Sequence, residues 1–533
     1  MAIVNTQSEA NSFVQVSPLL ASVRDISSGM TADQRLLVVR QLATLLEDYY
    51  VHLPLKRSSL GIDPVQEASL LVDEVRFIQS DGDFFRRIFG SLKRLRDRHT
   101  ALRLPSPWRD MVAYLPFAAE SYYEAGRRRL VVSKLMADVG EPSFSVGVEI
   151  THWNGMSVGR FIEALSWESE GANPFARIAT TMRSLTVRPL GYMLPPTEDW
   201  VTLTYLTPDG IYHSATIPWR VYMPPGNSSA ASANVASSGG MAMFQGVDRN
   251  TLIINNTWYD LFSRRGGTGQ TSTITDSVRF QTVKNDAGEF GYIRIFSFDV
   301  PDPAAFVADF ARVLGQLPQR GLIIDIRSNP GGTIPAGEGL FALFTKGKTT
   351  PQPVSFRNTP AVRPLGDLPM FLKWKRSLDM QLETGEIFTQ GFPLTDPGDP
   401  ALNGIYPGKV VLIIDALCYS TTDFFVAGMQ DNGLAYVIGV DPVTGAGGAN
   451  VWSQRLLRQF VAESGGTEVT ELPSNIDIEI AMRRSMRVGP NDGLPLEGLG
   501  VFADRIYQPT RRDVLGENED LIDLACRVLS GQA

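Results

Sequence analysis

One serine, Ser420, stands where a buried strand is expected to give way to a helix. Residues 411–414 form an apolar run typical of a central strand, and Asn432-Gly433 is a helix-termination signal. A helix N-terminus offers unpaired backbone N–H groups and a positive dipole end. Both stabilise the oxyanion that forms when a serine hydroxyl attacks a carbonyl. Serine also commonly caps a helix without any chemistry, so this segment alone leaves both roles open.

Two consecutive glycines follow a second predicted strand. Residues 322–327 are typical of a buried strand, and the segment Asn329-Pro330-Gly331-Gly332 comes soon after it. Glycine tolerates positive φ, so backbone N–H groups in this segment can point into a cleft, as an oxyanion hole requires. An ordinary Pro-Gly turn after a strand would use the same residues.

A serine hydroxyl needs a neighbouring base to attack near neutral pH. Lys409 is the last lysine of the chain, so no lysine follows Ser420, and arginine stays protonated. The chain has only four histidines, at positions 52, 99, 152 and 213. A histidine that falls on a functional motif is therefore informative.

A second serine matches a different hydrolytic motif. Residues 155–159 fit the G-x-S-x-G elbow of α/β-hydrolases, which would make Ser157 the nucleophile of an esterase. That fold places its histidine late in the chain, yet only His213 follows Ser157. Asn154-Gly155 is also a typical hairpin turn. We therefore keep the esterase only as a lesser alternative.

The sequence resembles the C-terminal-processing serine peptidases, a family that includes the tail-specific proteases, the tricorn core and chlamydial protease-like activity factor. Residues 322–332 resemble the family's D-x-R-x-N-x-G-G segment. Residues 411–433 resemble its nucleophile segment, in which the serine lies three residues before an acid. Residues 96–100 are similar to the D-x-H-T element of the histidine-using branch. Residues 496–504 are similar to a C-terminal element that carries a glutamate.

The resemblance implies a role for each motif residue. Ser420 would be the nucleophile, His99 the base and Glu497 the acid that orients His99. The oxyanion would be bound by the N–H of Thr421 and by that of Gly331 or Gly332. The family's other branch uses a lysine after the serine, but the corresponding residues here, 444–448, contain none.

Some alternatives near these residues stay open. The interval between Ser420 and Glu497 is longer than the resemblance leads us to expect, which we attribute to an insertion around residues 452–478. Asp492 or Asp504 could therefore replace Glu497. Cys418 is expected to fill the core rather than to act as a nucleophile, and Asp415 is expected only to end its strand.

The elements that must position these residues divide the chain into four parts. Residues 1–111 are predicted to be a helical region whose first strand, over residues 99–104, carries His99. Residues 112–223 are strand-rich, and residues 246–533 alternate strands and helices as in an α/β core. The resemblance implies a PDZ-like fold for the strand-rich part and a crotonase-like (ClpP/crotonase-type) fold for the core.

A linker is predicted over residues 224–245. Its segment from Pro224 to Gly240 is rich in serine, alanine, asparagine and glycine and has almost nothing to bury. Small exposed residues are good substrates for proteases, and some members of the family are activated by internal cleavage. We therefore predict nicking within this linker.

The composition of the chain limits the kinds of partner that the protein can be expected to bind. Of the 533 residues, 43% are hydrophobic and 20% are charged, and the net charge of −8 argues against a dedicated nucleic-acid binder. No apolar run approaches the ~18 residues that a membrane span needs. The N-terminus lacks a secretory signal, so we expect a cytoplasmic protein or one exported without a recognisable signal peptide. Cys418 and Cys526 are too few for a disulfide framework or a zinc cage.

The resemblance thus implies a serine endopeptidase that hydrolyses protein or peptide substrates through an acyl-enzyme, with a Ser-His-Glu triad and without a metal or cofactor. The main alternative is a catalytically inactive protein whose PDZ-like domain captures an extended peptide by strand addition. Assembly into a homo-oligomer stays open.

Overall fold

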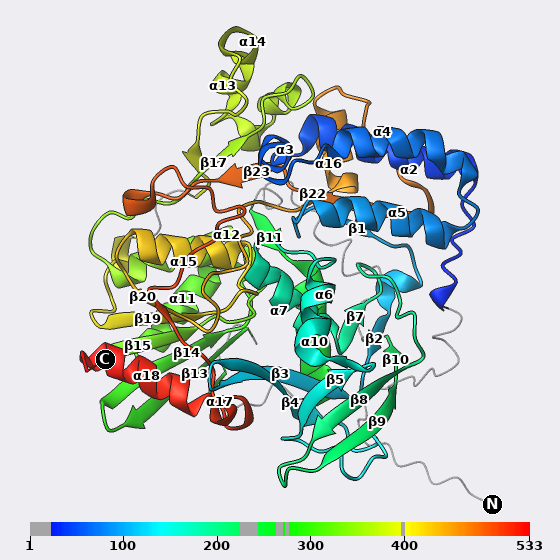
Figure 1. Cartoon of the computed structure of the whole chain (residues 1–533). Coiled ribbons are helices and arrows are strands. Elements are labelled where there is room, and N and C mark those ends of the chain that lie inside the picture. Colours follow the sequence, from blue (N-terminus) through cyan, green and yellow to red (C-terminus); the bar gives the residue numbers. More distant parts are fainter. Residues whose placement is uncertain (1–22, 224–243, 263–269, 272–276, 396–399, 533) are drawn as a thin grey trace, which may run out of the picture.

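A helical region comes first in the chain. The computed structural model describes residues 23–223, 244–262, 270–271, 277–395 and 400–532. Four early helices are α2 (Ala32–Thr44), α3 (Leu53–Leu60), α4 (Pro64–Glu74) and α5 (Asp81–Arg94), and they lie together at one end of the molecule (Figure 1). A capping box of Thr31 and Gln34 begins α2, and Asp63 caps α4 before Pro64. Helices therefore predominate among residues 32–94.

A small sheet joins this region to residues more than 370 positions later. Strand β1 (Ala101–Arg103) pairs antiparallel with β22 (Asp477–Ile480), which also pairs with β21 (Trp452–Ser453). The predicted strand over residues 99–104 is thus shorter, and His99 lies in a turn before it. The segment that we suspected of being an insertion forms β21, α16 (Gln454–Glu463) and β22.

An antiparallel sheet follows in the strand-rich part. Its strands run in the order β3-β4-β5-β8-β9, and β6 pairs with β5. Their bounds are β3 (Phe117–Glu124), β4 (Arg127–Leu135), β5 (Glu149–Trp153), β6 (Met156–Ser157), β8 (Trp200–Leu206) and β9 (Tyr212–Pro218). Beside it lie α6 (Val158–Ser166), α7 (Pro174–Ser184) and a three-stranded sheet of β2 (Val112–Tyr114), β7 (Val187–Pro189) and β10 (Arg220–Tyr222).

A mixed seven-stranded sheet forms the core of the later part. Its order is β12-β13-β14-β15-β19-β20-β24, parallel from β14 to β24. The bounds are β12 (Gln270–Thr271), β13 (Val278–Asn285), β14 (Gly288–Ile295), β15 (Gly321–Asp325), β19 (Lys409–Ile414), β20 (Tyr436–Gly439) and β24 (Arg505–Ile506). The two buried strands predicted from apolar runs, over residues 322–327 and 411–414, are confirmed as β15 and β19.

Helices cover both faces of this sheet, which explains the continuous apolar runs. On one face Ile323 and Ile413 pack with α18 (Glu519–Ser530); on the other, Leu412 packs in the large cluster that includes α11 (Pro303–Leu314) and α15 (Thr421–Asp431). Figure 1 shows α18 and α15 on opposite sides of the strands. A mixed α/β fold is therefore confirmed.

Shorter elements complete the later part of the chain. They include β11 (Gln245–Val247), α10 (Arg249–Phe262), β16 (Gly331–Thr333), α12 (Ile334–Glu338), β17 (Pro353–Phe356), α13 (Lys375–Asp379), β18 (Phe392–Pro393), β23 (Arg483–Ser485) and α17 (Arg511–Leu515). Most of the predicted linker, residues 224–243, lies outside the described residues, and Gln245 already belongs to β11. Of the helices described, none has the length and apolar character that crossing a bilayer demands.

Candidate active site

Ser420 lies at the N-cap of α15, after the loop that follows β19. Its backbone has φ 63° and ψ −120°, in a region that residues with a side chain rarely occupy. The backbone N–H of Ser420 donates to the Asp423 carboxylate at 2.9 Å, which helps to hold this conformation. The Ser420 Oγ atom is buried and finds no hydrogen-bond partner among the described residues. Ser420 and Asp423 thus have the arrangement of a capping box at the start of α15, but the Ser420 hydroxyl makes no regular cap hydrogen bond there.

The buried Asp423 carboxylate ties the Ser420 loop to a second loop. It accepts hydrogen bonds from the Thr444 hydroxyl and from the N–H groups of Ala446 and Gly447, the latter at 2.8 Å. Burial raises the pKa of Asp423 to about 6, although these donors oppose the shift. Residues 444–447, where the lysine-using branch was sought, therefore serve here as donors that hold Asp423.

The predicted oxyanion donors lie beside Ser420. A Cβ atom at Gly331, whose φ is 93°, would come within 2.8 Å of the Ser420 Cβ, so only glycine fits there. The Gly331 N–H donates to the Asn329 side chain at 3.0 Å, and Gly332 is paired with Gly246 of β11. Thr421 is the first residue of α15, where the N–H has no partner within the helix.

Strand β11 covers the hydroxyl. It runs antiparallel to β16, and a Cβ atom at Gly246 would lie only 2.5 Å from the Ser420 Oγ. The Thr421 hydroxyl donates to the Gly332 carbonyl at 2.7 Å, which ties the helix start to the same strand pair. A side chain at position 246 would therefore clash with the Ser420 hydroxyl.

His99 lies next to the Ser420 loop although 321 residues separate the two in sequence. The centroid of its buried ring is 4.6 Å from that of Tyr419, the residue directly before Ser420. The Arg98 N–H donates to the Tyr419 hydroxyl at 3.1 Å. Burial lowers the pKa of His99 to about 4, so the imidazole is neutral at neutral pH. Within the described part of the chain, neither ring nitrogen makes a hydrogen bond.

Asp97 fixes the turn that carries His99. Its carboxylate accepts from the His99 N–H at 2.8 Å and from the Thr100 hydroxyl at 2.9 Å. These local bonds give the backbone an alternative to strand pairing, which explains why β1 begins only at Ala101. Burial opposes ionisation of Asp97, but Lys56 and the neighbouring histidines hold its pKa below the usual value.

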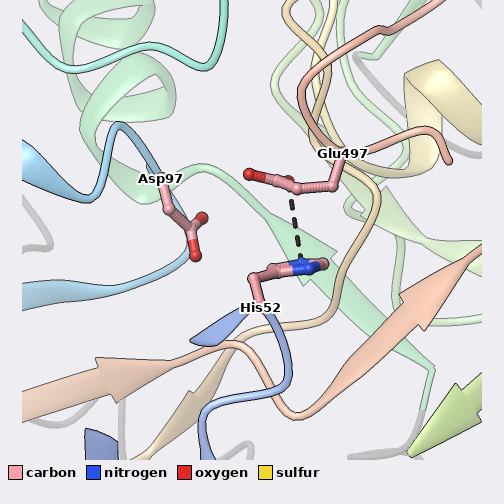
Figure 2. Close-up of side chains that lie close together, drawn as sticks. All are labelled: His52, Asp97 and Glu497. Atoms are coloured by element: carbon pink, nitrogen blue, oxygen red, sulfur yellow. Dashed lines mark ion pairs between the residues drawn. The ribbon is translucent and has the colours of Figure 1, made fainter. Parts of the chain in front are cut away.

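Glu497 reaches the same region and is bound by a lysine. Its carboxylate accepts from the Lys56 ammonium at 2.6 Å and lies 3.7 Å from the His52 Nε2 atom. Figure 2 shows the Glu497 carboxylate above the His52 ring, with Asp97 alongside. Burial raises the pKa of Glu497 to about 7, against the opposing effect of Lys56. The structure thus brings Glu497 close to Asp97, but its ionic partner is Lys56 rather than His99.

His52, Asp97 and Glu497 also resemble a metal-binding set. One ligand atom from each lies within 4.8 Å of the others. The Lys56 ammonium, however, already contacts the Glu497 carboxylate and supplies a positive charge there. The donor set therefore fits an ammonium, and we assign no metal to it.

Sequence reasoning missed Lys56 and His52. We searched for a lysine only after Ser420, whereas Lys56 comes from α3, hundreds of residues earlier. The two residues lie four positions apart on the segment that begins α3, so they share a face. Nothing in the local sequence separates a buried Lys56 from the exposed Arg57 beside it.

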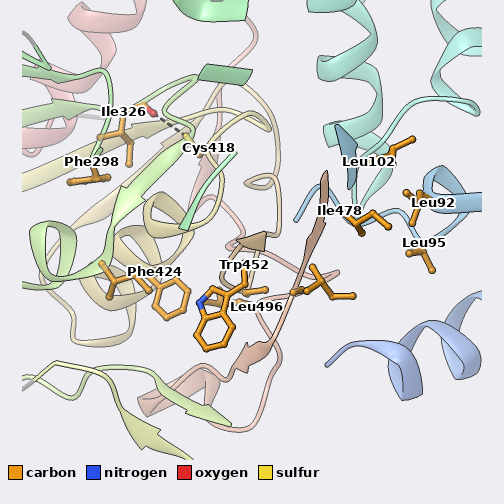
Figure 3. Packing of buried hydrophobic residues seen from close by; sticks show 14 of the residues in the cluster. Leu92, Leu95, Leu102, Phe298, Ile326, Cys418, Phe424, Trp452, Ile478 and Leu496 are labelled. Carbon is orange, nitrogen blue, oxygen red and sulfur yellow. Dashed lines mark hydrogen bonds between the residues drawn. The ribbon is translucent and has the colours of Figure 1, made fainter. Parts of the chain in front are cut away.

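Packing between the early helices and the later strands holds His99 against the core. Leu92 and Leu95 of the first part and Ile478 of β22 belong to one buried cluster, which Figure 3 shows together with Trp452 and Leu496. The backbone N–H of Val51 also donates to the Ala481 carbonyl. The segment of residues 452–480 thus serves to dock the helical region.

The other acidic residues considered in the sequence, Asp492, Asp504 and Asp415, make their contacts away from His99. The Asp504 carboxylate accepts from the Val437 N–H and the Gln430 side chain, next to β20. Asp492 lies in a turn near the surface. The Asp415 carboxylate accepts from several groups, among them the Ser328 N–H and hydroxyl. None of these contacts involves His99.

The two other candidate nucleophiles, Cys418 and Ser157, have structural roles. Cys418 is buried and its Sγ donates to the Ile326 carbonyl, while burial raises the pKa of the thiol well above its usual value. Ser157 is exposed on β6, and Asn154-Gly155 forms the hairpin turn between β5 and β6 with both φ angles positive. The predicted hairpin is confirmed.

This chain is similar to a known protein family and to several solved structures. The family model described as Peptidase family S41 matches residues 289–470. No curated protein matches the chain. The crystal structure of mature CPAF is similar with a TM-score of 0.66 and 17% identity, over 94% of this chain and 98% of the other. Mature CPAF complexed with lactacystin has the same TM-score and identity, over 94% and 99%. The photosystem II D1 C-terminal processing protease reaches a TM-score of 0.40 at 14% identity, over 94% and 98%.

Proposed function

Because the chain carries a peptidase family S41 domain and is a serine-type peptidase, we propose that it cleaves peptide bonds through an acyl-enzyme formed on Ser420. One observation carries this proposal. A buried serine hydroxyl without a hydrogen-bond partner lies at a strained helix N-cap, and a buried, neutral histidine packs on the preceding residue. If a serine served only as a structural cap, its hydroxyl oxygen would accept a hydrogen bond from a backbone N–H of the first helical turn.

The proposed chemistry follows the order of proton transfers in a serine hydrolase. The neutral His99 accepts the Ser420 proton as Oγ attacks the substrate carbonyl, and His99 then protonates the leaving amine. Water resolves the ester with His99 again as base. Glu497, with Asp97 beside it, supplies the negative charge that stabilises the protonated imidazole. The N–H groups of Thr421 and of Gly331 or Gly332 are the proposed oxyanion donors.

The substrate in this proposal is an extended peptide. Strand β11 occupies the edge of β16 beside Ser420, so a substrate strand would bind there after β11 moves away. We further propose that the core is crotonase-like and that the antiparallel sheet of residues 112–223 is PDZ-like. A catalytically inactive peptide binder is not favoured, because the chain is a serine-type peptidase.

A fluorophosphonate probe tests the proposed nucleophile, because it labels only activated serines. We expect labelling of the wild type and its complete loss in Ser420→Ala. Ser157→Ala is the matched control and should be labelled like the wild type, since Ser157 lies on the exposed β6. Labelling retained in Ser420→Ala, or absent from every form of the wild type including the cut chain described below, would refute the proposal.

The same preparations test the base. Incubated with denatured casein, His99→Ala should cleave slower than the wild type by at least about 10³-fold, because loss of a triad member leaves only binding and oxyanion stabilisation. Equal rates in the two proteins would remove His99 from the mechanism.

A further inference from the structure

We propose that Lys56 is a positioning residue of the peptidase reaction, which holds the Glu497 carboxylate in place beside Asp97, the residue that fixes the turn of His99. This inference rests on the proposed function, because it concerns the same site. Lys56 does not act on the substrate in this proposal. It acts through Glu497.

The first support is the placement of Lys56. Lys56 is only 3% exposed, whereas the next residue, Arg57, is exposed. The Nζ atom lies 2.6 Å from Glu497 Oε1, a short charge-assisted hydrogen bond. The turn before α3 is fixed by buried residues such as Leu53 and by the bond from the Val51 N–H to Ala481. Folding therefore places the ammonium before any substrate binds.

The second support is the balance of buried charge. One carboxylate oxygen of Asp97 and one of Glu497 lie within 4.8 Å of each other and of a His52 ring nitrogen, and all three residues are buried. Two buried carboxylates this close cannot both ionise without a cation beside them. Lys56 provides that cation and contacts Glu497 directly. The groups that face Glu497 are Lys56, His52, Asp97, Tyr50, Tyr419 and the Gly448 N–H.

The third support is the net charge of this cluster, which favours the protonated form of His99 during the reaction. Above about pH 7, where Glu497 is ionised, two carboxylates and one ammonium, with both histidines neutral, leave the cluster with one net negative charge. That charge stabilises His99 when it becomes positive on taking the Ser420 proton. Without Lys56, one carboxylate would hold a proton at neutral pH, and the remaining charge would no longer be fixed at Glu497.

The geometry also separates this role from that of a base. A lysine that acts as a base must present a neutral amine to the serine hydroxyl. The Lys56 amine instead donates to a carboxylate, and the Ser420 Oγ makes no bond to it. The group packed against the Ser420 loop is the His99 ring.

The test is the pH profile of kcat/KM for peptide cleavage, measured on whichever form of the full chain the fluorophosphonate probe labels. In Lys56→Met the acidic limb should move to higher pH by at least about one unit, because the lost positive charge no longer favours ionised Glu497. Activity at pH 7 should fall at least about tenfold and should recover largely at pH 9. Lys56→Arg should keep the limb near its original position.

Controls distinguish this inference from its alternatives. Lys284→Met removes an exposed lysine of β13 and should leave the profile unchanged. If Lys56→Met does not fold, the double variant Lys56→Met/Glu497→Gln should fold, because it removes the Glu497 carboxylate together with its cation, and Asp97 keeps its bonds from the His99 N–H and the Thr100 hydroxyl. A failure of that double variant would show that Lys56 only packs and would overturn the inference.

Other outcomes would also overturn it. An unshifted limb in Lys56→Met, or a rise in activity, would mean that Lys56 does not support Glu497 or competes with His99 for it. Inactivity of both Lys56→Arg and Lys56→Met at every pH would point to Lys56 as the base. In each of these cases Ser420 in the wild type is still labelled, so failure of the inference is distinct from failure of the proposed function.

Discussion

The chemistry of the site depends on single residues whose backbone or burial is unusual. Ser420 keeps a positive φ that the Asp423 carboxylate and the helix start enforce, and its hydroxyl has no competing bond among the described residues. His99 is neutral because it is buried, and Glu497 ionises late for the same reason. The two groups therefore define different parts of the pH dependence.

We expect kcat/KM to rise with pH through a single limb near pH 7. His99 has a pKa of about 4, so its basic form is present well below neutrality, whereas Glu497 becomes negative only above about pH 7. In Glu497→Gln the limb should disappear and the plateau should fall by about 10²- to 10⁴-fold. A pH series of initial rates checks this. If kcat/KM of the wild type rose between pH 4 and 5 instead, the limb would be assigned to the titration of His99.

The candidate site residues could be predicted from the sequence only where they belong to a recognisable motif. Ser420, His99 and Glu497 were found through short segments that resemble a family, and the scarcity of histidine and of lysine after Ser420 strengthened the choice. Lys56 and His52 carried no such signal, because their burial depends on packing between α3 and strands hundreds of residues away. The roles assigned to the site residues stay predictions.

The elements that place the site differ in how predictable they were. Strands β15 and β19 and helix α15 follow directly from apolar runs and helix-termination signals, since they are buried on both faces. Strand β11 was not predicted, and its first residue, Gln245, was placed at the end of the linker. Its three residues, Gln-Gly-Val, have no strand pattern of their own, and their conformation comes from pairing with β16.

Cutting the chain before β11 should expose Ser420. A site for a specific protease placed within residues 224–243 would free the N-terminal end of β11 while α10 still holds its other end. We expect fluorophosphonate labelling to become about tenfold faster after the cut. Loosening one or two backbone hydrogen bonds, each worth about 0.5–1.5 kcal/mol, is sufficient for such a change.

The control for this experiment is the cut Ser420→Ala protein, which should stay unlabelled. If the uncut chain reacts as fast as the cut one, β11 does not limit access to Ser420.

At the scale of the whole molecule, the site exists only where the early and late parts of the chain meet. The pairing of β1 with β22 brings His99 into place, and the buried ion pair of Arg98 with Asp248 joins its turn to the residue after β11. These contacts link residues 150 to 380 positions apart. No local pattern reveals such pairings, which is why the docking role of residues 452–480 was not predicted.

The cut chain should therefore remain one particle. We expect the fragments on either side of residues 224–243 to elute together from a sizing column and to separate only in denaturant, because buried apolar and ionic contacts join them. Separate elution with retained peptidase activity in the later fragment would contradict the assignment of His99 to the site.

The attachment of β11 at both ends has a kinetic consequence. As long as the strand is tethered, it competes with substrate at an effective concentration on the order of millimolar, independent of how dilute the protein is. One cut before it leaves the tether to α10 intact, so opening remains a step within a single molecule. The onset of activity after the cut should then follow first-order kinetics, with a half-time that dilution does not lengthen.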